Sequence, residues 1–169
     1  KVFLATKNNI LDCLENYRGN ITDELDEVVS IQSGAESDSQ NVSEEEISEN
    51  SPIAQTVNLL LEYAIKSGAS DIHIEPREDF VQVRYRIDGV LKEVNKLPRN
   101  VQGALVSRIK ILSNLKIDER RVPQDGRFKI KVSGKQYALR VSTLPIADGE
   151  KIVMRILDES NQAVALDSL

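Results

Sequence analysis

Residues 80–94 read FVQVRYRIDGVLKEV, and this stretch decides the fold class. Apolar and polar residues alternate up to Ile87, which is the period-2 pattern of a strand with one buried face. The Asp88–Gly89 pair that follows is a strong signal for a two-residue hairpin turn. Residues 90–94 then predict a returning strand, so an antiparallel sheet is expected.

The same patterns appear on both sides of this hairpin. Residues 71–76 predict a strand that precedes it. Residues 127–132 and 135–144 predict a second hairpin joined across Ser133–Gly134, and residues 152–157 predict a last strand. Together these segments predict about six strands.

Two segments carry helical spacing instead. Ser51–Pro52 is a good helix start, because Ser caps helices and Pro suits the first helical position. Apolar residues then recur at helical spacing up to Ser67–Gly68, and a second such pattern runs from Pro98 to Leu115. The order is helix, three strands, helix, three strands, which predicts an α+β fold with helices packed on an antiparallel sheet.

Charge is segregated along the chain. No Lys or Arg lies between Arg18 and Lys66, and residues 23–49 contain ten acidic residues. Residues 51–169 contain 19 basic and 15 acidic residues, a net charge of 19 − 15 = +4. An acidic segment therefore precedes a mildly basic domain.

This segregation predicts four parts. Residues 1–30 are interpreted as the tail of an earlier domain, and residues 31–50 as a flexible acidic linker. Residues 51–159 form the main domain, and residues 160–169 begin a further connection. The chain starts with Lys1 rather than Met, so we expect a piece of a longer protein.

Composition limits the possible chemistry. A lone Cys13 excludes an internal disulfide and fits a reducing, cytoplasmic setting. No apolar run approaches the roughly 18 residues of a membrane helix. The phosphate-binding loop Gly-x-x-x-x-Gly-Lys-Ser/Thr is absent, so we expect no catalytic residue in this stretch of chain. His73 has only Asp71 and Glu75 on its strand face, so we expect a structural or solvent-facing role and no metal site.

The second hairpin predicts an unusual pair. With Ser133–Gly134 as a two-residue turn, Arg127 lies directly opposite Arg140, and like charges in this arrangement are destabilising. Either nearby acids such as Asp125, Asp118 or Glu119 neutralise the pair, or an anion does. Gly126 is expected to make a tight turn that aims Arg127.

The first hairpin makes two more predictions. Its register places Arg84 opposite Glu93, which predicts an ordinary cross-strand ion pair. The same register leaves Arg86 facing Leu91, without such an explanation.

Five motifs occur in order over about 105 residues: ASDIHIEP (69–76), RIDGVL (86–91), RVPQDGR (121–127), LRVSTLP (139–145) and GEKIVMR (149–155). This series closely resembles the second N-terminal domain of the type II secretion and type IV pilus assembly ATPases, the GspE/PilB group. Residues 1–18 are similar, over a short stretch, to the end of that family's first N-terminal domain.

The resemblance implies a PAS-like domain that precedes a RecA-like ATPase domain in a hexameric ring. It implies that Arg127 and Arg140 contact the phosphates of ATP, which is bound with Mg²⁺ in the intact protein; neither is expected to be bound to this stretch of chain alone. The implied partners are neighbouring subunits, the RecA-like domain, and inner-membrane platform proteins reached through the first N-terminal domain. The implied location is the cytoplasm, peripheral to the inner membrane.

Two other functions compete with this one. A nucleic-acid-binding module would use Arg127, Lys129, Lys131 and Arg140 along a phosphate backbone, although few aromatic residues accompany them. A PAS-like sensor would hold a small ligand inside, but no polar residue on the expected core faces favours it.

Overall fold

A computed structural model describes residues 51–159 of the chain. The predictions for residues 1–30, 31–50 and 160–169 lie outside the described residues. The elements, in chain order, are α4 (Pro52–Lys66), β1 (Asp71–Pro76), β2 (Phe80–Ile87), β3 (Val90–Pro98), the short 3-10 helix η1 (Arg99–Val101), α5 (Gln102–Leu112), β4 (Gln124–Val132), β5 (Lys135–Ile146) and β6 (Gly149–Asp158).

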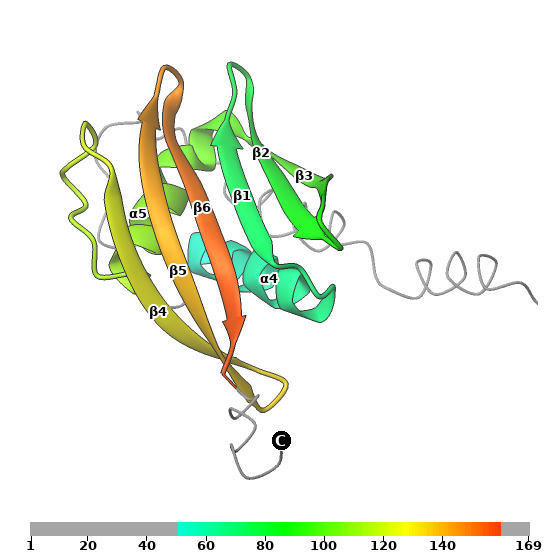
Figure 1. Ribbon diagram of the computed structural model, residues 1–169. Coiled ribbons are helices and arrows are strands. Elements are labelled where there is room, and N and C mark those ends of the chain that lie inside the picture. Colours follow the sequence, from blue (N-terminus) through cyan, green and yellow to red (C-terminus); the bar gives the residue numbers. More distant parts are fainter. Residues whose placement is uncertain (1–50, 160–169) are drawn as a thin grey trace, which may run out of the picture.

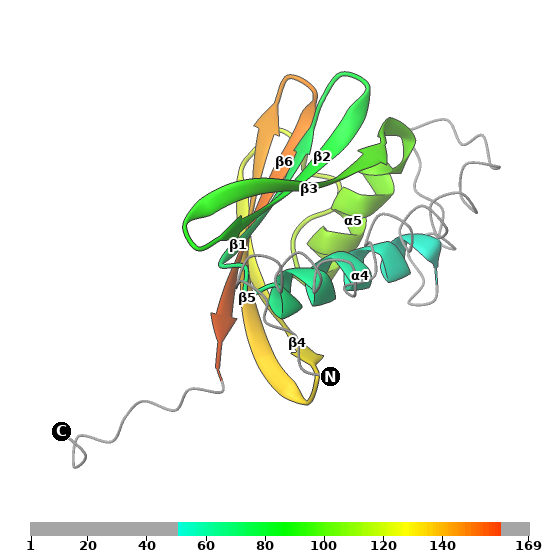
Figure 2. The same cartoon turned by 90° about the vertical axis from the view of Figure 1, so that its right-hand side faces the viewer.

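The six strands form one antiparallel sheet in the order β3-β2-β1-β6-β5-β4. Strands β1 and β6, far apart in sequence, are neighbours at its centre. Both α-helices cover the same face, and no other element within residues 51–159 covers the opposite one, which we call the open face. Figure 1 looks onto this open face and Figure 2 shows the two layers from the side. The predicted α+β fold is confirmed, whereas its PAS-like character stays a prediction.

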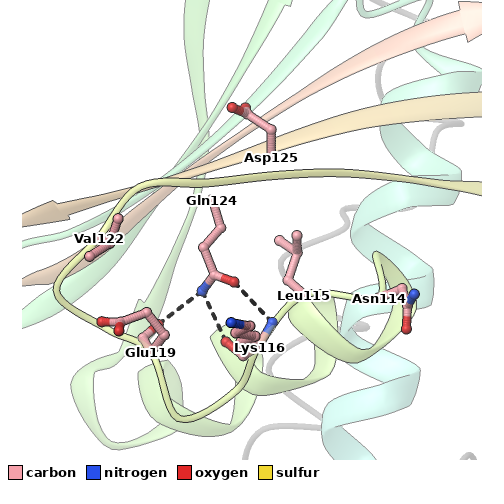
Figure 3. A pocket seen from close by; sticks show the side chains of 7 residues that line it. All are labelled: Asn114, Leu115, Lys116, Glu119, Val122, Gln124 and Asp125. Carbon is pink, nitrogen blue, oxygen red and sulfur yellow. Dashed lines mark hydrogen bonds between the residues drawn. The ribbon is translucent and has the colours of Figure 1, made fainter.

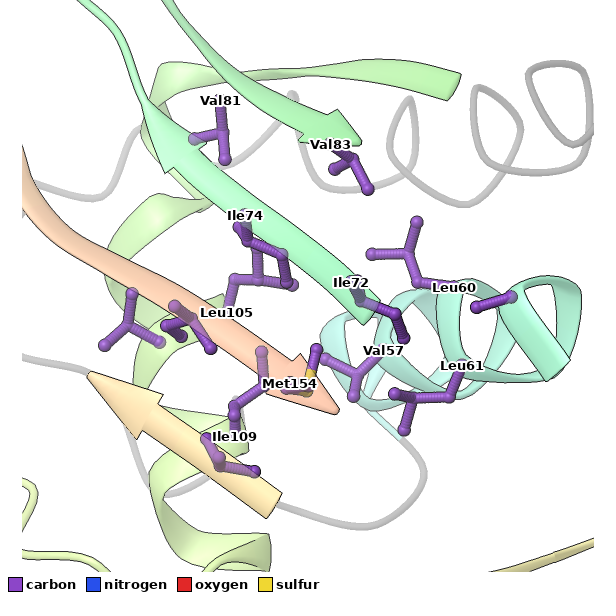
Figure 4. Packing of buried hydrophobic residues seen from close by; sticks show 14 of the residues in the cluster. Val57, Leu60, Leu61, Ile72, Ile74, Val81, Val83, Leu105, Ile109 and Met154 are labelled. Carbon is purple, nitrogen blue, oxygen red and sulfur yellow. The ribbon is translucent and has the colours of Figure 1, made fainter. Parts of the chain in front are cut away.

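The core lies between the sheet and the helices (Figure 4). Aliphatic side chains from both helices and from the inward positions of the strands are buried there, each less than about a tenth exposed. The members labelled in Figure 4 are Val57, Leu60, Leu61, Ile72, Ile74, Val81, Val83, Leu105, Ile109 and Met154. Burial of one face of each strand leaves the alternate residues on the open face.

Helix α4 begins and ends as the sequence predicts. The Ser51 hydroxyl accepts a hydrogen bond from the backbone N–H of Ala54 at 3.2 Å, and Pro52 follows at the first helical position. Helix α4 is also hydrogen-bonded to the sheet, because the Tyr85 hydroxyl on β2 donates to the Leu60 carbonyl at 2.7 Å. Burial raises the pKa of Tyr85, so this hydroxyl stays protonated.

Both predicted hairpin turns are confirmed. Asp88 and Gly89 have φ values of 51° and 80°, and Ser133 and Gly134 have 50° and 82°, as in turns with two left-handed residues. The second hairpin has the predicted register. The first shifts between Val83 and Arg84, because a bulge inserts an extra residue that the sequence pattern does not reveal.

The second helix is shorter than predicted. Helix α5 ends at Leu112 rather than Leu115, since Ser113 caps it and Asn114 adopts a left-handed φ of 56°. Asn tolerates this conformation better than most residues. Over the described part of the chain, no helix is long and apolar enough to cross a bilayer.

Candidate anion-binding site

The open face of the sheet carries charged side chains in transverse rows. The register places Arg86, Asp71, Arg155, Arg140 and Arg127 side by side on β2, β1, β6, β5 and β4. We call these five residues the arginine row. It crosses five of the six strands seen in Figure 1 and contains four guanidinium groups but one carboxylate.

Arg127 and Arg140 are directly opposite each other, as predicted. Both side chains are exposed. Within residues 51–159, neither forms a salt bridge. Side chains at such positions have Cβ atoms about 5 Å apart, so the two positive charges are close and uncompensated.

The acids that could have neutralised this pair are engaged elsewhere or do not reach it. The Asp125 carboxylate accepts a hydrogen bond from the Ser142 hydroxyl. The Glu119 carboxylate accepts one from the Arg121 backbone N–H at 2.8 Å. Asp118 also makes no salt bridge with Arg127 or Arg140 in the described structure. Within residues 51–159, no local acid therefore forms a salt bridge with the pair, and the Asp125 carboxylate two residues from Arg127 keeps its charge while it accepts from Ser142.

Arg155 and Arg86 flank Asp71. Arg155 Nε lies 2.9 Å from Asp71 Oδ1, and Arg86 Nε lies 3.8 Å from Asp71 Oδ2. Burial on its own would raise the pKa of Asp71, but hydrogen bonds from Arg155 and Ser70 outweigh it and hold the pKa below its usual value. Asp71 is therefore an anion at neutral pH. It is the salt-bridge partner of Arg86, for which the hairpin register of β2 and β3 gave no partner.

A second carboxylate on β1 is surrounded by cations. Glu75 is buried, and its oxygens lie 2.5 Å from Arg84, 2.7 Å from Lys151 and 3.1 Å from Arg77. Burial opposes ionisation, but hydrogen bonds from Lys151 and Arg84 lower the pKa of Glu75 below its usual value. The cations around β1 thus each have a carboxylate partner, in contrast to the Arg127–Arg140 pair.

Arg84 corrects one prediction. It lies opposite Glu93, as the hairpin register requires, but its salt bridge is with Glu75 on β1. Glu93 instead pairs with Lys96 at 3.2 Å. The more buried carboxylate is the stronger partner because it is less screened by water, and the sequence of one hairpin does not show the neighbouring strand.

His73 lies on the open face between Asp71 and Glu75, as predicted. Its Nδ1 is 3.9 Å from Glu75 Oε1. Burial, followed by the nearby charge of Lys151, lowers the pKa of His73, so it is neutral at pH 7. No three His, Cys, Asp or Glu side chains in the described structure come together in a group that could hold a metal ion.

Gly126 supports Arg127 in a way that differs from the prediction. It lies within β4 rather than in a tight turn. A Cβ atom at this position would lie 2.6 Å from the Ser113 carbonyl oxygen and 2.8 Å from Leu115 Cδ2. Glycine is needed because the end of α5 packs directly against the strand that carries Arg127.

Gln124 holds the loop before β4 (Figure 3). Its Nε2 donates to the carbonyls of Lys116 and Glu119 at 2.9 Å each, and its Oε1 accepts from the Lys116 backbone N–H at 2.9 Å. An open depression of about 550 Å³ lies beside this clamp, with Leu115 and Val122 in its lining. The clamp fixes the path of the chain three residues before Arg127.

A buried ion pair anchors the same loop. Lys110 on α5 is 1% exposed, and its Nζ lies 2.6 Å from Glu150 Oε1 on β6. The same ammonium donates to the Glu119 carbonyl at 2.8 Å. Lys110 thereby joins α5, the loop before β4, and β6. These contacts fix the position at which β4, the strand that carries Arg127, begins.

The geometry suits an anion of high charge better than a nucleic acid. Arginine stays charged and pairs with phosphate oxygens through two N–H groups. Base stacking would require aromatic side chains beside the row. Among residues 51–159, the aromatic side chain on the open face is Phe80, which alternates with inward-facing Val81 and has the ammonium of Lys96 5.2 Å from its ring centre.

A family model described as type II/IV secretion system protein matches residues 46–169. The chain belongs to this family. The predicted resemblance to the GspE/PilB group is therefore confirmed, and the arginine row lies within the matched part of this type II/IV secretion system protein.

The chain is similar to proteins of type II secretion and of type IV pilus assembly. Type II secretion system protein E of Xanthomonas campestris pv. campestris is 42% identical over 156 residues, covering 92% of this chain and 28% of the relative. Type IV pilus assembly ATPase PilB of Myxococcus xanthus is 41% identical over 176 residues, covering 98% and 30%. Type II secretion system ATPase E of Vibrio cholerae is 46% identical over 124 residues, covering 73% and 25%.

The chain thus spans less than a third of the length of these three relatives. Among solved structures, the Legionella pneumophila ATPase DotB matches with a TM-score of 0.40 at 19% identity, covering 59% of this chain and 28% of that one.

Sequence reasoning found Arg127 and Arg140 but missed Arg155 and Asp71. A signal for Arg155 exists, because a two-residue turn at Ala147–Asp148 places it opposite Arg140. For Asp71, the short connection between β1 and β2 places it opposite Arg86, but its pairing with Arg155 joins segments about 80 residues apart and has no local signal.

Proposed function

We propose that this chain is the N-terminal regulatory and oligomerisation module of a hexameric secretion or type IV pilus assembly ATPase. Arg127 and Arg140 contact the phosphates of ATP at the interface with the RecA-like ATPase domain. The observation that carries the proposal is the exposed pair of arginines, directly opposite each other and without a salt bridge in the described structure.

Physical chemistry supports a phosphate as the missing partner. Two adjacent guanidinium groups repel each other, so the isolated domain is less stable for having them. A phosphate group removes this repulsion and gains charge-assisted hydrogen bonds, which are stronger than neutral ones. The contacts of Gln124, Gly126 and Lys110 fix the start of β4, so the backbone of Arg127 is in position before the anion binds.

The proposed roles concern binding and orientation. Bound ATP with Mg²⁺ supplies the phosphoryl group, and this chain places positive charge against it. In phosphoryl transfer such arginines act as fingers that offset negative charge in the transition state. Loss of that charge after hydrolysis weakens the attraction, and the module then moves relative to the ATPase domain.

The proposal extends to partners and location. Neighbouring subunits of the ring and the RecA-like domain are the contacts of residues 51–159, and inner-membrane platform proteins are reached through residues 1–30. The assembly is cytoplasmic and peripheral to the inner membrane. The relatives named as a type II secretion protein and a type IV pilus assembly ATPase support a place in such a machine, and the further partners and the location are part of the proposal.

ATP turnover by the full-length protein tests the proposal. Arg127→Gln or Arg140→Gln is expected to reduce turnover at least tenfold, since arginine fingers are worth about 10³–10⁵ in rate. Arg120→Gln is the matched control, because Arg120 is also exposed but lies in the loop before β4. Unchanged turnover in both row variants would remove the basis for a nucleotide-facing role.

A further inference from the structure

Arg155 stands between two electrostatically different parts of the open face. On one side it pairs with Asp71, at 2.9 Å. On the other it lies directly opposite Arg140, which is opposite Arg127. Its side chain is 65% exposed in spite of the salt bridge, so its guanidinium has room to turn toward either neighbour.

We propose that Arg155 is a third member of the anion site, and that Asp71 is a built-in competitor that holds Arg155 until an oligophosphate displaces it. The inference rests on the proposed function and adds the extent of the site and its regulation. Binding exchanges the salt bridge Asp71–Arg155 for a contact between Arg155 and the anion.

The geometry favours several linked phosphates over a single one. Arg127, Arg140 and Arg155 occupy adjacent register positions on three neighbouring strands. Strands in a sheet are about 4.8 Å apart, so the three positions span roughly 10 Å. A chain of phosphates contacts all three guanidinium groups while they stay spread, whereas a single phosphate would have to draw three like charges together against their repulsion.

The exchange leaves Asp71 with partners. Ser70 Oγ donates to Asp71 Oδ2 at 2.9 Å, and Arg86 Nε lies 3.8 Å from the same oxygen. When Arg155 turns away, Asp71 keeps the hydroxyl bond and Arg86 remains close enough to pair with it. The Arg155 side of this pair is 65% exposed and the Asp71 carboxylate only 7%. Water therefore weakens the hold on Arg155, and an anion of several charges can draw it away while Asp71 keeps its other partners.

Titration of the 169-residue chain with inorganic triphosphate at low salt tests the inference, because exposed charges are least screened there. Calorimetry gives the affinity. Arg155→Gln is expected to weaken binding about three- to fivefold, the size of one exposed ion pair. Asp71→Asn is expected to tighten it by a similar factor, because the competitor loses its charge.

Each variant has a control with the same change in net charge. Arg120→Gln matches Arg155→Gln, and Asp148→Asn, in the turn between β5 and β6, matches Asp71→Asn. Orthophosphate is the second probe, and its weaker binding is expected to change less in Arg155→Gln. Circular dichroism confirms that each variant is folded, and Asp71→Asn keeps an acceptor for Ser70.

Three outcomes would overturn the inference: no measurable binding of triphosphate to the unmodified chain, no tightening in Asp71→Asn beyond Asp148→Asn, or an Arg155→Gln variant that matches Arg120→Gln. Failure here is distinguishable from failure of the proposed function. If Arg127→Gln and Arg140→Gln reduce ATP turnover while Arg155→Gln does not change triphosphate affinity, the two-arginine site stands without its third member.

Discussion

Gly126 shows how one residue without a side chain serves the candidate site. Its Cα lies so close to the end of α5 that a Cβ would meet the Ser113 carbonyl oxygen at 2.6 Å. A methyl group here must displace backbone, not a flexible side chain. The position of β4, and with it Arg127, depends on this close approach.

Gly126→Ala is therefore expected to lower the free energy of unfolding by about 1–3 kcal/mol, the usual cost of overpacking. Chemical denaturation measures it. Gly103→Ala in α5 is the control, since a Cβ there meets nothing within 4 Å; it is expected to stabilise the protein by about 0.5–1 kcal/mol. Equal effects at the two glycines would contradict the packing explanation.

Glu75 makes stability depend on pH. Burial is outweighed by hydrogen bonds from Lys151 and Arg84, and its pKa lies below the usual 4.5. A group with a lowered folded-state pKa stabilises the fold above its unfolded pKa, and this contribution is lost as pH falls through the folded-state value. Glu75 therefore contributes fully at pH 7 and little in strong acid.

Glu75→Gln tests this pH dependence. The variant is expected to be about 2 kcal/mol less stable than the original protein at pH 7, and the difference is expected to shrink as pH falls below 4.5. Urea denaturation at several pH values measures it. Glu62→Gln, which removes a surface ion pair with Lys66 on α4, serves as control with a smaller effect. A difference for Glu75→Gln that does not change with pH would be inconsistent with this explanation.

At the scale of elements, the Lys110–Glu150 ion pair joins α5, the loop before β4 and β6. Both side chains are nearly inaccessible, at 1% and 6%. Removing one partner of such a pair leaves a buried charge without compensation, whereas replacing both with apolar groups of similar volume is often neutral.

Lys110→Met alone is expected to destabilise the protein by about 3–5 kcal/mol, and the double variant Lys110→Met/Glu150→Met is expected to regain most of that loss. Hydrogen exchange provides a second readout. Backbone amides of residues 116–123 should exchange faster in both variants, because the hydrogen bond from the Lys110 ammonium to the Glu119 carbonyl is lost. A double variant as unstable as the single one would show that the pair is not the anchor.

The elements were largely predictable because their signals are local. The Asp88–Gly89 and Ser133–Gly134 turns fix two hairpins, and alternation fixes which residues face inward. The end of α5 was missed because Leu115 continues the apolar spacing past Asn114, whose left-handed conformation ends the helix. The bulge opposite Val83 was missed because its extra residue, Val94, is the last residue of the predicted strand 90–94, whereas β3 continues to Pro98.

At the scale of the whole molecule, the site depends on strand order. The pair Arg127–Arg140 was predictable because one hairpin contains it. Asp71 as the partner of Arg155 was not, since this contact joins β1 to β6, which is distant in sequence. Glu75 as the partner of Arg84 was missed because it is a diagonal neighbour on β1, where the register places His73 opposite Arg84. Charge balance on a sheet face is a property of neighbouring strands, and a single hairpin register does not contain it.

The same charge arrangement predicts that the adjacent arginines lower the stability of the isolated domain. Arg140 lies between Arg127 and Arg155, so Arg140→Gln removes two repulsive neighbours. We expect its free energy of unfolding to rise by a few tenths to about 1 kcal/mol. Arg120→Gln, in the loop, should change it by less than about 0.5 kcal/mol. A clear loss of stability in Arg140→Gln would show that the arginine has a structural role instead.

The most direct test of the central claim is ATP turnover in the full-length protein for Arg127→Gln, Arg140→Gln and the double variant, measured beside their stability. If both arginines serve one phosphate site, each single variant loses turnover at least tenfold although it is no less stable, and the double variant loses much less than the product of the single effects. Turnover that is unchanged, or that falls only as far as stability falls, would contradict the claim.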